Sequence, residues 1–164
     1  MKSILNEIEA IYSTIQPKKQ KEFIHKIIKC NGTIVGLGAG RMGYSLQAFV
    51  MRLSHFGYRS FMIGDTSIPM ITEEDLIIVN SSSGNTKSIV LLTEIAKKNG
   101  AKIISLTGNG NSLIAKLSDF SLVYEIIDSK QLMKSVYEQF TFLFFDHCAA
   151  MIAKENEISK SEIE

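Results

Sequence analysis

Apolar residues near the N-terminal end of the chain recur at the spacing of an amphipathic helix. One stripe, with members three or four residues apart, is formed by Ile4, Ile8, Ile11, Tyr12 and Ile15. This spacing predicts a helix that ends before Pro17. A second short helix is predicted over residues 18–29, where apolar positions again fall on one face.

From residue 33 onward, short continuous apolar runs alternate with helical patterns. The runs predict strands buried on both faces, over residues 33–37, 60–63, 76–80, 102–106 and 121–126. Helices are predicted over residues 42–56, 86–99 and 111–117, and a long final helix over 130–154. This alternation predicts an α/β fold, a three-layer α/β/α sandwich around a mostly parallel, doubly wound, flavodoxin-like sheet of five strands.

Doubly wound sheets bind their ligands beyond the carboxyl ends of the strands. Candidate chemistry is therefore expected in the loops that follow Leu37, Ile63, Val79 and Leu106. With no repeat and no linker, residues 31–155 are expected to form one domain. The helices within residues 1–30 are expected to pack on this core or on a partner subunit, and the charged tail over 156–164 is expected to fray.

Charge and composition exclude several classes of partner. The 164 residues include 18 Lys plus Arg and 17 Asp plus Glu, so a net charge of +1 gives no strong attraction to nucleic acid or to an anionic membrane. No run approaches the ~18 to 20 apolar residues of a membrane helix, and the first residues do not read as a secretory signal. Cys30 and Cys148 stand far apart and form no CxxC pair. We therefore expect a cytoplasmic protein without a metal site.

The first loop of interest contains a GxGxxG pattern, formed by Gly38, Gly40 and Gly43. This pattern is typical of dinucleotide-binding turns, and Asp65 stands roughly where a ribose-binding acid is expected. The same glycines also suit a turn that brings backbone amides against a phosphate. A third interpretation is that they serve only a tight turn and close packing.

The loop after the third predicted strand is rich in hydroxyl groups. Ser81, Ser82, Ser83 and Thr86 fall within six residues, and Gly84 frees the backbone between them. Hydroxyls, backbone amides and the positive end of the following helix can converge on one anion without a cationic side chain. We interpret the loop as a phosphate cradle, although one such residue alone would suffice as a helix cap.

Together these residues resemble the sugar isomerase (SIS) domain and, within it, the 6-phospho-3-hexuloisomerases. The segments that carry the resemblance are Gly38-Ala-Gly-Arg41, Met51-Arg-Leu-Ser-His55-Phe-Gly57, Gly64-Asp-Thr-Ser-Ile-Pro69, Ser81-Ser-Ser-Gly-Asn-Thr-Lys-Ser88 and Ala101-Lys-Ile-Ile-Ser-Leu-Thr107. The resemblance runs from about Thr33 to Ala150. Tyr137-Glu138-Gln139 is similar to the Phe-Glu-Gln segment of the hexuloisomerases.

The resemblance implies the interconversion of arabino-3-hexulose 6-phosphate and fructose 6-phosphate. Moving a carbonyl group by one carbon requires a base and an acid acting through an enediol, with no redox cofactor and no metal. The resemblance implies Glu138 as the base and His55 as a second catalytic group that moves a hydroxyl proton or assists ring opening. The alternatives are a solvated helix glutamate and a histidine favoured by the helix dipole alone.

Binding roles follow from the same resemblance. The substrate and its phosphate are expected to contact Gly38, Gly40, Arg41, Asp65, Thr66, Ser81, Ser82, Ser83, Gly84 and Thr86. Arg41 is expected to pair with the phosphate or a sugar oxygen, although an arginine in such a loop also serves as a clamp on a neighbouring carboxylate.

The chain departs from the family pattern at three places. Met42 stands where serine is usual, Asn85 and Ser82 replace a glutamate and a glycine, and residues 132–135 lack the usual Pro-Met-Gly. These changes affect the sugar end of the expected site more than the phosphate cradle. Two other functions remain open: a non-catalytic phosphosugar-binding regulatory module and an NAD-dependent oxidoreductase.

Apolar residues also exceed the needs of a small sheet. The N-terminal stripe and the run Phe140, Phe142, Phe144 and Phe145 suggest burial between subunits. Because SIS domains usually assemble with their sites at interfaces, the resemblance implies a homo-oligomer, a dimer or a tetramer, with the tetramer favoured.

Overall fold

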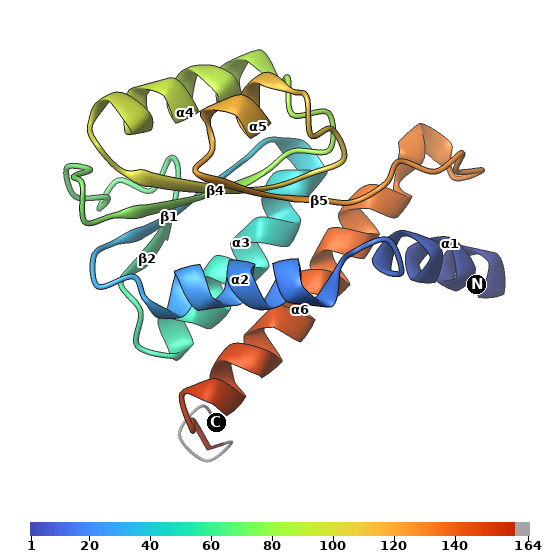
Figure 1. The fold of residues 1–164 in the computed structure, drawn as a ribbon, viewed down its shortest axis with the longest axis horizontal. Helices are drawn as coiled ribbons and strands as arrows, with labels where there is room; N and C mark the ends of the chain where they lie inside the picture. The colour runs from blue at the N-terminus through green and yellow to red at the C-terminus, as the bar shows by residue number, and fades with distance from the viewer. Residues whose placement is uncertain (160–164) are drawn as a thin grey trace.

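The computed structural model describes residues 1–159, which form one sheet with helices on both faces (Figure 1). The strands are β1 (Ile34–Gly38), β2 (Ser60–Met62), β3 (Leu76–Asn80), β4 (Lys102–Thr107) and β5 (Phe120–Val123). The helices are α1 (Lys2–Tyr12), α2 (Pro17–Ile28), α3 (Gly40–His55), α4 (Lys87–Lys98), α5 (Leu113–Leu117) and α6 (Val136–Glu155), and a 3-10 turn, η1, covers Leu132–Lys134.

The strands follow the order β2-β1-β3-β4-β5, and every neighbouring pair is parallel. Ile34 pairs with Leu76 in β3, which in turn pairs with Lys102 in β4. The order reverses at β1, as in flavodoxin-like sheets. The predicted α/β class, the five strands and the doubly wound topology are confirmed, and the sheet is parallel throughout.

Alternating side chains of the strands build two separate cores. Val35 and Leu37 pack with the helices α4 and α5, whereas Ile34 packs on the other face with α2, α3 and α6. Phe49 of α3 stacks on Phe145 of α6 with the ring centroids 4.9 Å apart. The helix α1 packs on α6 and projects beside the sheet (Figure 1).

The final helix begins later than the sequence pattern predicts. Residues 130–135 are not α-helical, because Met133 and Lys134 have φ of 52° and 56°, which an α-helix cannot accommodate. The helix α6 therefore starts at Val136. The last strand also differs from the prediction, since β5 ends at Val123 instead of residue 126. Residues 160–164, which belong to the tail expected to fray, lie outside the described part of the chain.

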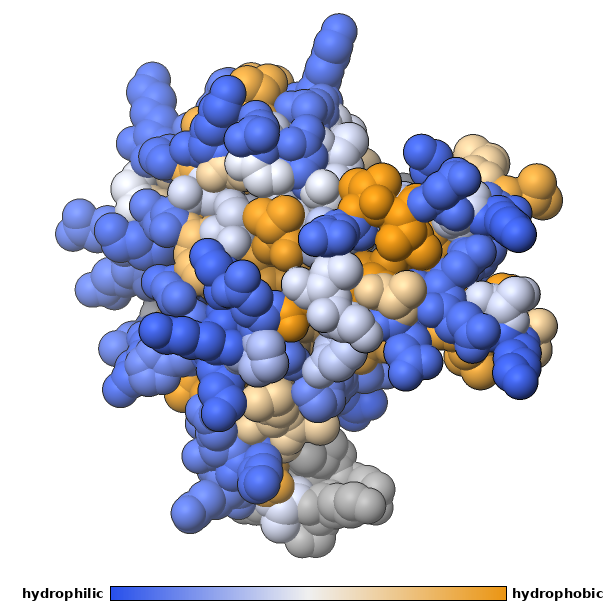
Figure 2. Space-filling model, turned by 45° about the vertical axis from the view of Figure 1, so that its right-hand side comes forward, coloured by the Kyte–Doolittle hydropathy of each residue, from blue (hydrophilic) through white to orange (hydrophobic). Residues whose placement is uncertain are grey.

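Several large apolar side chains remain exposed. On α1, α3 and α6 they are Leu5, Tyr12, Tyr44, Met51, Phe142 and Leu143. Figure 2 shows apolar side chains gathered between the body of the molecule and the arm that contains α1. None of the helices within residues 1–159 has the length and apolar character that crossing a membrane requires.

Candidate functional site

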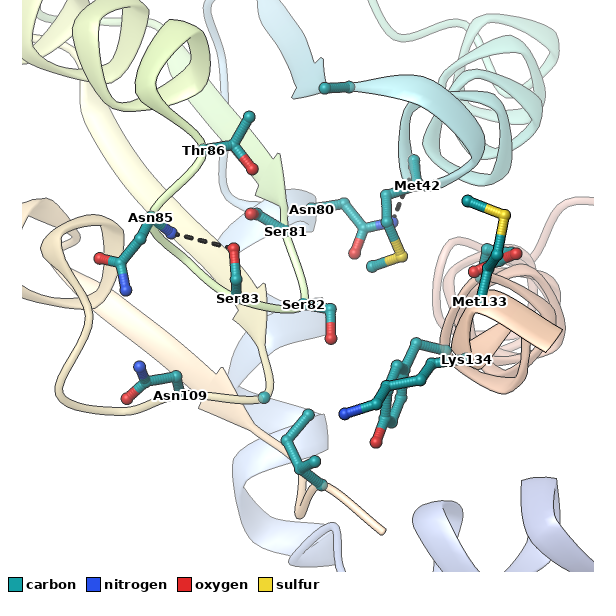
Figure 3. A pocket seen from close by; sticks show the side chains of 15 residues that line it. Met42, Asn80, Ser81, Ser82, Ser83, Asn85, Thr86, Asn109, Met133 and Lys134 are labelled. Atoms are coloured by element: carbon teal, nitrogen blue, oxygen red, sulfur yellow. Dashed lines mark hydrogen bonds between the residues drawn. The ribbon is translucent and has the colours of Figure 1, made fainter. Parts of the chain in front are cut away.

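A cavity of about 660 Å³ opens at the carboxyl ends of β1, β3 and β4 (Figure 3). Five segments line it, contributing Ala39 and Met42, residues 80–83 with Asn85 and Thr86, Gly108 and Asn109, Ile126, and Met133, Lys134, Tyr137 and Glu138. Three of the four loops expected to carry chemistry meet here. The loop after β2 does not reach the cavity.

The serine loop, residues 81–86, is held against the start of α5 by hydrogen bonds. Gly84 has φ of +64°, and its carbonyl accepts a hydrogen bond from the backbone N–H of Ile114 at 3.0 Å. Asn85 Oδ1 accepts from the N–H of Leu113, also at 3.0 Å. Ser81 closes the turn, because its Oγ accepts from the N–H of Gly84 at 3.2 Å. The loop is therefore preorganised.

The hydroxyl groups of this loop are directed to the cavity more than to helix capping. Thr86 is the N-cap residue of α4, yet its side chain makes no capping hydrogen bond in the described structure. Ser83 Oγ accepts from the N–H of Asn85 at 3.3 Å, and Ser82 also lines the cavity (Figure 3). Because the first N–H groups of a helix lack partners within the helix, the start of α4 adds donors for an anion.

The GxGxxG glycines serve the packing of β1 against α3. A Cβ on Gly38 would lie 2.8 Å from Gly43 Cα, and one on Gly43 would lie 2.6 Å from the Gly38 carbonyl oxygen. Neither Gly38 nor Gly40 lines the cavity, whereas Ala39 between them does. Close packing is the interpretation that this geometry favours.

Asp65 and Thr66 lie outside the cavity. The Asp65 carboxylate accepts a hydrogen bond from the Met62 N–H at 2.8 Å and so closes its own turn after β2. Within one chain, these two residues are therefore not brought together with the serine loop.

His55 is also remote from the cavity of its own chain. It is the last residue of α3, whose first turn borders the cavity, and a helix of 16 residues is roughly 24 Å long. Its Nδ1 lies 3.5 Å from Nη1 of Arg52, and it is exposed. One chain alone does not place His55 beside Glu138.

Glu138 lines the cavity from the first turn of α6 and forms an ion pair with Arg41. The Glu138 side chain is 14% exposed and that of Arg41 is 67% exposed. Arg41 lines an adjoining smaller hollow instead of the main cavity. In this structure Arg41 therefore contacts a neighbouring carboxylate, which is the arrangement given as the alternative to a phosphate-binding arginine.

Asn80 ends β3 at the floor of the cavity and was missed by sequence reasoning. Its Nδ2 donates to the Met42 carbonyl oxygen at 2.9 Å, to Ser45 Oγ at 3.0 Å and to Thr141 Oγ1 at 3.3 Å. Its Oδ1 is buried and has no hydrogen-bond partner among residues 1–159. The one available signal was a polar residue that ends an otherwise apolar strand. Asn80 fastens β3 to both α3 and α6.

Three further polar residues of the cavity had no assigned role in the sequence interpretation: Tyr137, Asn109 and Lys134. The Tyr137 hydroxyl donates to the Ile127 carbonyl oxygen at 2.9 Å, and burial raises the pKa of Tyr137, so this donor stays protonated. Lys134 was predicted within a helix, where nothing marked it as a cavity residue. Across residues 1–159, no cluster of three or more His, Cys, Asp or Glu is arranged to hold a metal ion.

Comparisons with known proteins agree with this architecture. The family model described as SIS domain matches residues 26–144. A 3-hexulose-6-phosphate isomerase of Methanocaldococcus jannaschii is 32% identical over 146 residues, which cover 88% of this chain and 80% of the relative. A 3-hexulose-6-phosphate isomerase of Mycobacterium gastri is 30% identical over 168 residues, covering 98% and 84%.

A solved structure gives the same picture. A crystal structure of a Methanococcus jannaschii protein, for which a molecular function of 3-hexulose-6-phosphate isomerase was inferred, superposes with a TM-score of 0.89 at 29% identity. The match covers 99% of this chain and 93% of the other.

Proposed function

The chain belongs to the SIS domain family, and from this premise we propose that it is a sugar-phosphate isomerase that interconverts 3-hexulose 6-phosphate and fructose 6-phosphate. One observation carries the proposal. A single cavity joins the hydroxyl-rich loop over residues 81–86 to the carboxylate of Glu138 on the facing helix. Anion-binding groups and a proton-transfer group thus lie where one small phosphorylated ligand can reach both.

The serine loop is suited to the phosphate. Ser83 and Thr86 offer hydroxyls, and the first turn of α4 offers backbone N–H groups and the positive end of its dipole. Because Gly84 and Asn85 fasten the loop to the start of α5, these donors need little reorganisation when the anion binds. The sugar then extends toward α6.

Glu138 is the proposed base. It takes the proton from C2 of the 3-ketose, the resulting enediol loses its double bond when the proton is returned to C3, and a hydroxyl proton moves from O2 to O3. No atom is gained or lost, so no oxidant or reductant is needed. Arg41 keeps the Glu138 side chain in place through their ion pair.

His55 would enter the site from a second copy of the chain. His55 lies far from the cavity of its own chain. The helices that carry His55 and Glu138 also bear exposed apolar residues, Tyr44 on α3 and Phe142 on α6, which offer a surface for self-association. A homo-oligomer formed through these helices is therefore part of the proposal, with His55 assisting the hydroxyl proton or ring opening.

The test is an isomerase assay that couples fructose 6-phosphate formation to a reporter enzyme. Glu138→Gln is expected to abolish turnover while fructose 6-phosphate still raises the melting temperature. Ser83→Ala is expected to raise KM with a smaller change in kcat. Glu155→Gln, at the exposed end of the same helix, removes the same charge outside the cavity and is expected to behave as wild type.

Three results would contradict the proposal. Full activity of Glu138→Gln would remove the assigned base. A rise in melting temperature with fructose 6-phosphate but no turnover by the wild-type protein would instead support a non-catalytic phosphosugar-binding module. Stabilisation by NAD alone would favour the oxidoreductase interpretation.

A further inference from the structure

Lys134 brings a positive charge to the cavity from the segment between β5 and α6. Figure 3 shows its side chain extending into the cavity, with the amino group directed toward the wall that carries Ser82 and Asn109. No carboxylate within residues 1–159 forms an ion pair with this amino group. Its charge is thus available to a ligand.

The backbone that presents Lys134 has an uncommon conformation. Met133 and Lys134 lie consecutively in the left-handed region, with φ of 52° and 56°, where a Cβ is crowded. Such backbone persists only where its surroundings fix it, and it is concentrated at functional sites. Here Glu7 accepts a hydrogen bond from Ser129 Oγ at 2.7 Å, and the Tyr137 hydroxyl holds the backbone upstream. These two contacts hold the backbone that immediately precedes Met133 and Lys134.

The opposite wall, as far as the described residues form it, supplies hydrogen-bond donors but no cation. Ser82, Ser83 and Thr86 are neutral, and the nearby guanidinium of Arg41 is engaged with Glu138. A phosphate monoester carries close to two negative charges at neutral pH, which hydroxyls and amides can solvate but cannot balance. A lysine ammonium group supplies the missing charge at a single point.

We infer that Lys134 is a phosphate-binding residue, whose ammonium group pairs with the phosphate of the bound sugar from the side opposite α4. The identity of the ligand as a phosphate monoester rests on the proposed function. The phosphate is then held between neutral donors of the serine loop and one cation from η1, so affinity depends on both walls of the cavity.

The test is calorimetric titration of the wild-type protein, Lys134→Met and Lys134→Gly with inorganic phosphate and with fructose 6-phosphate, at low and high salt. Glycine adopts the left-handed conformation without strain, so Lys134→Gly removes the charge without disturbing the fold. Both variants are expected to bind about ten- to a hundredfold more weakly than wild type. Their affinities should also depend less on salt.

Two further variants serve as controls. Lys130→Met removes the same charge from the same segment, but its side chain lies outside the cavity, so wild-type affinity is expected. Lys134→Arg keeps the charge and is expected to retain most of the affinity.

Three outcomes would overturn the assignment: wild-type affinity in Lys134→Gly, an equal loss in Lys130→Met, or no binding of either anion by the wild-type protein. An absence of isomerase activity together with Lys134-dependent phosphate binding would overturn the proposed reaction and leave the assignment of Lys134 standing.

Discussion

Gly84 is the residue on which the shape of the serine loop depends most directly. Its φ is +64°, and an added Cβ would lie 2.1 Å from Ser112 Oγ at the start of α5. We expect Gly84→Ala to destabilise the protein by roughly 2–4 kcal/mol and to weaken phosphate binding, because either the loop or the start of α5 must move. Urea denaturation and calorimetric titration measure the two effects.

Gly57 provides the matched control for this prediction. Its φ is +87°, but no atom of residues 1–159 lies within 4 Å of an added Cβ, so Gly57→Ala carries the backbone cost without a steric clash. It is expected to cost about 1–2 kcal/mol and to leave phosphate binding unchanged. Equal losses of stability and affinity in the two variants would show that contact with Ser112 is not the cause.

Residues of the cavity could be predicted where a local pattern marks them. The hydroxyls over residues 81–86 and Glu138 stand in short motifs, and they do line the cavity. Asn80 and Lys134 were missed because the first reads as the end of a strand and the second as part of a helix. The roles of Asn80 and Lys134 depend on groups that other elements of the fold bring close to them. A local sequence pattern contains no information about those groups.

At the scale of elements, α1 holds the segment that presents Lys134 through hydrogen bonds to Glu7. Glu7 accepts hydrogen bonds from Ser129 Oγ, Gln131 Nε2 and the N–H of Lys130 at 2.7, 3.0 and 3.2 Å. We expect Glu7→Ala to loosen residues 129–135, with faster hydrogen exchange there and phosphate affinity reduced by about two- to tenfold. The melting temperature should change little, because Glu7 belongs to neither core.

Acid should reproduce this loosening. The hydrogen bonds from Ser129 and Gln131 hold the pKa of Glu7 below its usual value, so the carboxylate form, and its contribution, is present at neutral pH and is lost as the pH falls through that lowered pKa. Glu9→Ala removes the same charge from α1 without these hydrogen bonds. An equal effect of Glu9→Ala on exchange would contradict the role of Glu7.

The elements differ in how far the sequence alone predicts them. The strands were predictable because buried parallel strands are continuous apolar runs, whichever residues surround them. The start of α6 was not predictable, because the contact that fixes the preceding segment joins Ser129 to Glu7, 122 residues earlier. Helical composition over residues 130–135 gives no sign of that partner.

At the scale of the whole molecule, the proposed function requires two copies of the chain. If each site joins His55 of one copy to Glu138 of another, His55→Ala and Glu138→Gln should each be inactive. After mixing and subunit exchange, half of the dimers combine both variants and each holds one intact site, so about a quarter of wild-type activity should return. The coupled isomerase assay measures this recovery.

Two alternatives give different results in that experiment. If His55 is not needed, His55→Ala is active before mixing. If both residues act within one chain, or if the copies do not exchange, the mixture stays inactive. Subunit exchange is followed independently by labelling the two variants with different fluorophores.

The helix α6 completes a core that the first helices begin, and this has a consequence for synthesis on the ribosome. A chain emerges N-terminal end first, so the sheet face under α4 and α5 can be covered once α5 has appeared. The face shared by α2 and α3 stays open until Phe145 of α6 arrives to stack on Phe49. A nascent chain that already contains all five strands therefore has one sheet face covered by helices and one apolar face still exposed. Exposed apolar surface of this kind is what chaperones bind.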